Sequence, residues 1–141
     1  MTKLKSMLSA LLVGVSLNAA AADWNMVSSS AKEQMFMDAQ SILKEKDNGL
    51  LQVRVLENFA DKRDMGPGFY DHKSRFMLLA VDCNAGAVSY EQWSLHADAL
   101  GTGATVWAAG MQTGQTFFRP ESGTGYERIV AMVCNSPIAI H

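Results

Sequence analysis

The stretch Ser74–Cys83 reads SRFMLLAVDC, and it predicts the element around which the rest of the fold is arranged. We expect a β-strand over His72–Asp82, because its side chains alternate with a period of two. Apolar residues occupy both faces, with Phe76, Leu78 and Ala80 on one and Met77, Leu79, Val81 and Cys83 on the other. A strand that is apolar on both faces is typical of the middle of a covered sheet. The sequence therefore predicts a central strand with a cysteine at its exit.

A second apolar stretch, YERIVAMVC over Tyr126–Cys134, has the spacing of a helix. The residues that share one helical face are Tyr126, Ile129, Val130, Val133 and Cys134. Ser122 or Thr124 is placed to cap the helix, and Pro137 lies just beyond its end, so we expect the tail that follows to fray. The face that carries Cys134 is predicted to pack against the sheet.

The first 22 residues have the three parts of a secretory signal peptide. Lys3 and Lys5 precede an apolar run over residues 7–17, and the small-residue tract Ala19–Ala22 follows it. The apolar run is shorter than the roughly 20 residues that cross a membrane. We therefore expect cleavage after Ala21 or Ala22 and a single exported domain over residues 23–141, without a transmembrane segment. No cysteine stands at the cleavage point to carry a lipid, so the sequence predicts a periplasmic or secreted protein.

Charge argues against a nucleic-acid partner. Of 12 basic side chains two lie in the signal, which leaves 10 against 14 acidic ones in the mature chain. This acidic excess does not predict the basic stripe or patch that is the electrostatic footprint of a nucleic-acid-binding domain.

Exactly two cysteines occur, and both lie in the predicted mature chain. In an exported protein this number indicates one intramolecular disulfide, between Cys83 and Cys134. The alternative is a redox-active or metal-binding pair of thiols. It is less favoured, because the two are not spaced as C-x-x-C and no histidine ligands lie near them in the sequence.

The remaining strands follow from period-two patterns and from turn residues. We expect strands over 24–28, 50–59, 87–97 and 105–109, and a strand broken by a kink over 35–38 and 41–43. A helical turn over residues 31–39 is the alternative for the kinked part. The phase of apolar residues changes within 87–97, which predicts a bulge near Glu91-Gln92. The connection Ala60–Asp71 is long, and Gly66-Pro67-Gly68 excludes a regular element through its middle.

Most predicted strands are joined by turns rather than by helices, which favours antiparallel order. The predicted fold is α+β: a five- or six-stranded antiparallel sheet with a C-terminal helix packed on one face and tied by the disulfide.

The order of these features resembles the bacterial surface-adhesin protein E family. The resemblance rests on Trp24, the stretch 35–42 with Asp38 and Ser41, Val53-Arg54-Val55, His72-Lys73-Ser74, Val81-Asp82-Cys83, Tyr90, Pro120 and Cys134. It implies an antiparallel sheet with a disulfide-tethered C-terminal helix, often in a homodimer, and a role in adhesion to host matrix at the cell surface.

We therefore interpret the chain as a non-enzymatic binding module without a cofactor, with a host-matrix or envelope protein as its partner. Aromatic residues and basic residues near the long connection are the candidates for contacting that partner. They are Lys62, Arg63, Phe69, Tyr70, Lys73, Tyr90, Trp93 and Trp107. Burial in the core is the alternative for the aromatic residues, and a solvated surface of mixed charge is the alternative for the basic ones.

Two other function classes stay open as alternatives. One is a periplasmic small-ligand-binding or inhibitor-like domain that uses the sheet face under the helix. The other is a hydrolase, although the sequence has no G-x-S-x-G motif, and His72, His96 and His141 lack the spacing of metal ligands.

Overall fold

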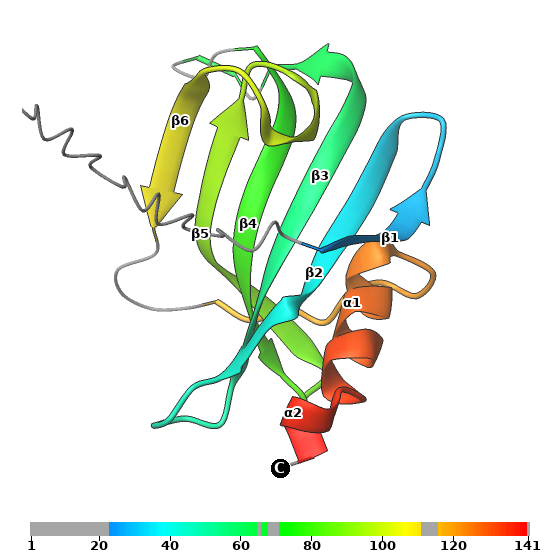
Figure 1. The fold of residues 1–141 in the computed structure, drawn as a ribbon, viewed down its shortest axis with the longest axis vertical. Helices are drawn as coiled ribbons and strands as arrows, with labels where there is room; N and C mark the ends of the chain where they lie inside the picture. Colours follow the sequence, from blue (N-terminus) through cyan, green and yellow to red (C-terminus); the bar gives the residue numbers. More distant parts are fainter. Residues whose placement is uncertain (1–22, 65, 68–70, 111–115, 141) are drawn as a thin grey trace, which may run out of the picture.

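The computed structural model describes residues 23–64, 66–67, 71–110 and 116–140, and it forms one antiparallel sheet in which strand order follows chain order (Figure 1). The strands are β1 (Trp24–Ser29), β2 (Glu33–Lys44), β3 (Leu51–Arg63), β4 (His72–Asp82), β5 (Ala87–His96) and β6 (Thr105–Gly110). A 3-10 turn, η1 (Ala99–Gly101), precedes β6, and two helices follow it, α1 (Gly125–Cys134) and α2 (Pro137–Ile140). The predicted fold class, a six-stranded antiparallel sheet with a C-terminal helix on one face, is confirmed.

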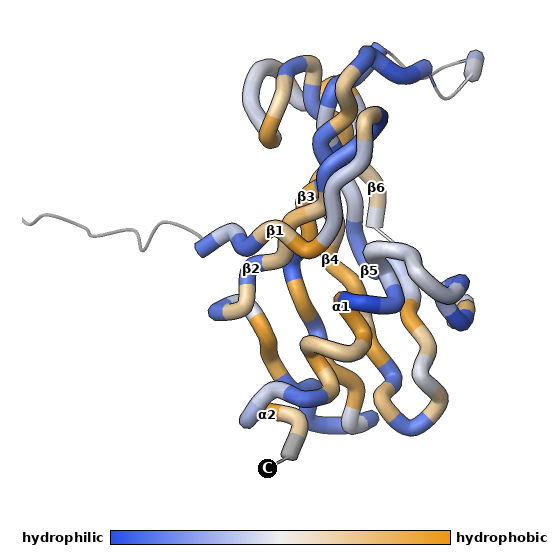
Figure 2. Tube along the Cα trace, turned by 90° about the vertical axis from the view of Figure 1, so that its right-hand side faces the viewer, coloured by the Kyte–Doolittle hydropathy of each residue, from blue (hydrophilic) through white to orange (hydrophobic). Residues whose placement is uncertain are grey.

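The central position predicted for β4 is also confirmed, because β3 and β5 pair with it on either side. Apolar stretches, orange in Figure 2, run along both the strands and the helix. The core lies between α1 and the sheet face that carries Val53, Val55 and Leu79, all of them fully buried. Ile129 and Val133 of α1 are likewise 0% exposed, so the helix fills the space over the sheet face that carries Val53, Val55 and Leu79.

The alternation of side chains gives the sheet two distinct faces. We call the face that carries Val53, Val55 and Leu79 the helix face, since α1 packs on it. The other, which carries Arg54, Phe76 and Leu78 at the intervening positions, is called the open face.

The register of strand pairing confirms both the kinked strand and the bulge. The β2–β3 pairing shifts between Asp38 and Leu43, so residues 31–39 do not form the alternative helical turn. In the β4–β5 pairing, Leu78 faces Gln92 but Leu79 faces Tyr90, which leaves Glu91 as the extra residue of a bulge.

Two sequence-based boundaries are wrong. The strand predicted to end at Phe59 continues to Arg63, because Ala60 donates to the Lys32 carbonyl at 2.9 Å and Arg63 pairs with His72. The connection to β4 is correspondingly shorter than predicted. The tail after α1 does not fray over residues 137–140: it forms α2, and Ala139 packs against the core.

Candidate functional site

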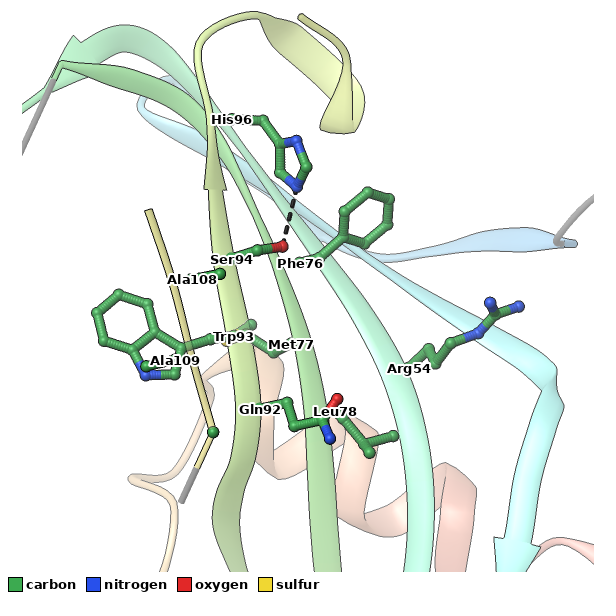
Figure 3. A pocket seen from close by; sticks show the side chains of 11 residues that line it. Arg54, Phe76, Met77, Leu78, Gln92, Trp93, Ser94, His96, Ala108 and Ala109 are labelled. Carbon is green, nitrogen blue, oxygen red and sulfur yellow. Dashed lines mark hydrogen bonds between the residues drawn. The ribbon is translucent and has the colours of Figure 1, made fainter. Parts of the chain in front are cut away.

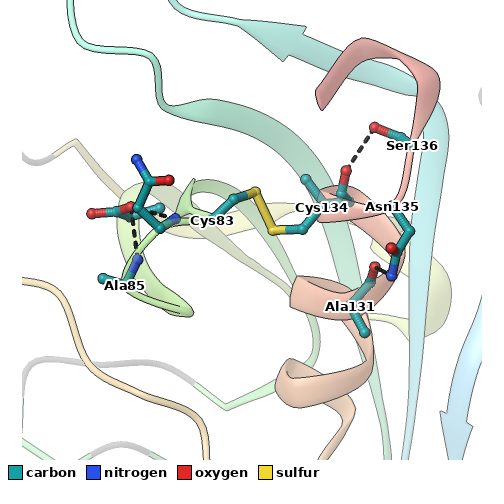
Figure 4. Close-up of a disulfide and its surroundings, with 9 residues drawn as sticks. Cys83, Ala85, Ala131, Cys134, Asn135 and Ser136 are labelled. Atoms are coloured by element: carbon teal, nitrogen blue, oxygen red, sulfur yellow. Dashed lines mark hydrogen bonds between the residues drawn. A yellow bond between two sulfur atoms is a disulfide. The ribbon is translucent and has the colours of Figure 1, made fainter. Parts of the chain in front are cut away.

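The end of α1 is joined to the end of β4 by the predicted disulfide, which is confirmed. Cys83 and Cys134 are bonded with a Cα–Cα distance of 5.6 Å, across 51 positions of sequence (Figure 4). At the other end of α1, Thr124 rather than Ser122 is the N-cap, and its hydroxyl accepts from the amide of Glu127. The helix is therefore held by a cap at its start and by a covalent bond at its last residue.

A buried ionic network links the first turn of α1 to the helix face. Glu57 of β3 is only 3% exposed. Arg75 donates its Nε to this carboxylate at 2.8 Å, and the Tyr126 hydroxyl donates to the other carboxylate oxygen at 2.8 Å. Tyr90 donates in turn to the Tyr126 hydroxyl at 3.1 Å. Every oxygen of the buried carboxylate thus has a partner, as a charge at this depth requires.

Burial and neighbouring charges shift the pKa values of two residues in this network, Tyr126 and Arg75. Desolvation, followed by the nearby Glu57 carboxylate, raises the pKa of Tyr126 far above its ordinary value of 10.0, so its hydroxyl stays protonated as a donor. Burial acts to lower the pKa of Arg75, but Glu57 outweighs it and the pKa is raised, so the guanidinium stays charged. The network is a fixed structural link between helix and sheet.

Three of the residues predicted to contact a partner, Lys73, Trp93 and Trp107, lie on the helix face of the sheet. Trp93 and Trp107 lie with ring centroids 4.2 Å apart, each half-buried, at the β5–β6 side. Lys73 is on β4 at the same face, two positions from Arg75. Arg63, at the end of β3, stacks its guanidinium over the Phe59 ring at 3.9 Å and pairs in register with His72, which is in phase with Ser74 and Phe76 of the open face. We call Lys73, Trp93 and Trp107 the aromatic-basic band.

The other predicted contact residues differ in their positions. Lys62 is exposed at the end of β3. Tyr90 belongs to the network under α1 rather than to a free surface, and its ring also lies 5.6 Å from Phe118. Phe69 and Tyr70 lie outside the described residues. The structure therefore brings Trp93 and Trp107 into contact, places Lys73 on the same face of the sheet, and assigns Tyr90 to the core.

The open face carries a hollow of about 660 Å³ that the sequence analysis did not predict (Figure 3). Its lining includes Phe76 and Leu78 of β4, Gln92, Ser94 and His96 of β5, Arg54 of β3 and Ala108 of β6. The hollow is on the face opposite α1. The sheet face under the helix, proposed above as a ligand site, is instead filled by Ile129 and Val133.

Ser94 and His96 form a hydrogen-bonded pair beside this hollow, with Oγ and Nε2 2.9 Å apart. Residues two apart on a strand share a face, so the pair could have been found from the sequence. A nucleophilic serine needs its histidine to be oriented by a third group. In the described part of the chain, the Nδ1 atom of His96 is buried and has no hydrogen-bond partner. Burial also lowers the pKa of His96. The geometry is that of a polar pair and not of a catalytic triad.

Among the residues that the structure describes, no three His, Cys, Asp or Glu side chains are grouped to hold a metal ion. Within the same residues, none of the helices has the length and apolar character needed to cross a membrane.

Taken together, the fold defines a small single-sheet domain of the α+β class, in which a C-terminal helix is covalently fixed across an antiparallel meander. This class of fold and the sequence features described above agree with a known protein family. The chain belongs to the surface-adhesin protein E family, whose model matches residues 24–135.

Solved structures support the fold. The structure of crystal form II of Haemophilus influenzae protein E is similar with a TM-score of 0.53 at 10% identity, covering 77% of this chain and 91% of that one. A second structure of Haemophilus influenzae protein E gives a TM-score of 0.52 at 10% identity, covering 77% and 87%. Among curated proteins, none matches the sequence significantly.

Proposed function

We propose that the chain is an exported, non-enzymatic binding module that contacts a host-matrix or envelope protein through the aromatic-basic band. The observation that carries this proposal is membership of a surface-adhesin family over residues 24–135. From the export signal predicted over residues 1–22 we infer that the domain works in the periplasm or at the cell surface.

The composition of the band suits protein recognition. Tryptophan is among the residues that most often dominate the binding energy of protein interfaces. Trp93 and Trp107 present a half-buried pair whose side chains are already held together, so little conformational entropy is lost on binding. Lys73 supplies the cation of the band. An acidic or mixed surface with apolar anchors is the complementary partner.

The band can be tested with purified protein from residue 23 onward. Immobilised wild-type chain would be exposed to solubilised host matrix and to envelope extract, and captured proteins would be titrated by surface plasmon resonance. We expect Trp107→Ala to weaken binding at least tenfold, the loss typical of a dominant contact. The control is Met132→Ala, since Met132 is 43% exposed on α1 outside the band. Equal affinity of wild type and Trp107→Ala would rule out this surface.

Location is a separate question with its own test. Intact cells treated with a non-permeant protease should lose the protein if it is displayed at the surface. Full protection would place it in the periplasm and would favour an envelope partner over host matrix.

A further inference from the structure

The hollow on the open face has the size and composition of a small-molecule site. Its volume of about 660 Å³ lies within the range of about 300–1,000 Å³ that is usual for ligand pockets. Phe76 and Leu78 form an apolar floor on the central strand. On the β6 side, the side chains of Ala108 and Gly110 are small or absent, so they do not block access to this floor. The floor is therefore accessible from the β6 side.

One end of the hollow is closed by packed aromatic rings. Phe76 meets His96 edge-on with centroids 5.2 Å apart, and Trp24 of β1 lies 5.6 Å from Phe76. The turn η1 presses on the same ring, since a Cβ on Gly101 would stand 2.2 Å from it. This end is consequently a fixed wall with little freedom to collapse into the hollow.

Polar groups at this end have unused hydrogen-bonding capacity. His96 lines the hollow and is 9% exposed, yet its Nδ1 has no partner among the described residues. Ser94 forms one hydrogen bond with His96 and is half-buried, so its hydroxyl can form another. Buried polar atoms without partners are uncommon in proteins and call for an explanation.

An ion pair lies at the other end of the hollow and turns its cation toward it. Among the described residues that line the hollow, Arg54 is the one charged side chain, and no carboxylate is among them. Arg54 donates one terminal nitrogen to Asp38, whose side chain is 2% exposed beneath it. The guanidinium has five N–H donors, and the Arg54 side chain is 54% exposed, so it can also bind an anion from the solvent side.

We propose that the open face binds an amphipathic monoanion: a ring or acyl group that lies on Phe76 and Leu78, with a carboxylate or sulfonate at Arg54. Gln92, exposed beside Leu78 on the neighbouring strand, provides a further hydrogen-bonding group along the rim. The proposed anion site does not depend on the proposed protein partner, although Trp93 of the aromatic-basic band also lines the hollow.

Two matched probes test both halves of the proposal. 8-Anilinonaphthalene-1-sulfonate supplies aromatic rings with one sulfonate, and N-phenyl-1-naphthylamine supplies the same rings without charge. We expect the folded wild-type protein to bind the anionic probe saturably at one site, measured by fluorescence titration. Amide shifts in a nitrogen-15 NMR titration should concentrate on Leu78, Gln92 and Ala108.

Variants then assign the site. Ala108→Phe fills the hollow from an exposed position and should weaken the anionic probe at least tenfold, whereas Met132→Phe adds the same ring on α1 and should change nothing. Arg54→Gln should weaken the anionic probe about two- to fivefold, as an exposed ion pair does, and leave the neutral probe unchanged. Arg54→Lys keeps the positive charge and should bind the anionic probe nearly as tightly as the wild type. If Arg54→Gln folds poorly, this variant still tests the role of the charge. Non-saturable binding, or equal affinity of wild type and Ala108→Phe, would overturn the proposal.

Discussion

Replacing both cysteines by serine, Cys83→Ser with Cys134→Ser, is expected to lower the free energy of unfolding by about 4 kcal/mol. The magnitude follows from the 51 positions between the cysteines, because the entropy of the unfolded chain rises when a loop of that size is opened. Domains of this size are typically stable by about 5–15 kcal/mol, so the loss is a large share of the total. In melting temperature it corresponds to a fall of roughly 12–20 °C.

The assay is urea unfolding of wild type and double variant, each with and without dithiothreitol, followed by far-ultraviolet circular dichroism. Reductant should destabilise the wild type to the level of the variant and leave the variant unchanged. Hydrogen exchange should show the largest loss of protection in α1, while the interior of β3 and β4 keeps more of it. A difference of less than about 1 kcal/mol between oxidised and reduced wild type would refute the entropic argument.

Three further substitutions probe how the helix and η1 are held. Tyr126→Phe removes the donor to Glu57 and should cost about 1–3 kcal/mol in urea unfolding at pH 7. Burial raises the pKa of Tyr126 above its ordinary value of 10.0, so the stability that it contributes is fully present below about pH 10 and declines progressively as the pH rises further. Melting of Tyr126→Phe between pH 8 and 11 should lack this alkaline decline, and an undiminished decline would contradict the assignment. Gly101→Ala introduces a Cβ 2.2 Å from Phe76 at a φ of +72° and should cost about 1–3 kcal/mol, so an unchanged melting temperature would show that η1 moves freely. Ile129→Ala should cost about 2–5 kcal/mol by leaving a cavity under α1, and a loss below 1 kcal/mol would mean that the helix relaxes into it.

The homodimer implied by the family resemblance stays a prediction. Sedimentation equilibrium of the purified domain checks it directly, with twice the chain mass as the expected result. A single-chain mass at micromolar concentration would contradict it.

Strand positions could be predicted because they depend on local pattern, and the disulfide could be predicted because the chain has exactly two cysteines. The run from His72 to Asp82 defined β4 at both ends, since a turn residue or polar neighbour flanks it on each side. The phase change around Glu91 revealed the bulge, because a single extra residue moves all later side chains to the opposite face. Helix α1 followed from the apolar spacing that ends at Cys134.

What the sequence did not reveal depends on contacts between distant segments. The end of β3 is polar from Asp61 to Arg63, and it is a strand because β2 and β4 pair with its neighbours. Glu57 falls in phase with the core residues of its strand, a visible signal of a buried carboxylate, but its partner Tyr126 lies 69 positions away. The hollow depends on small side chains of β6 lying beside Leu78, an arrangement that only the assembled sheet defines.

The meander has a consequence for the order in which the protein assembles. Each strand hydrogen-bonds to its neighbour in the chain, so every step of sheet formation closes a short loop. By contrast, Arg128 of α1 donates to the carbonyl of Val27 across 101 positions. Because short loops close at lower entropic cost and form sooner, we expect the helix to dock last, onto a finished sheet. Oxidation of the two thiols then comes after this docking, so the covalent bond preserves a completed fold and does not guide the chain toward it.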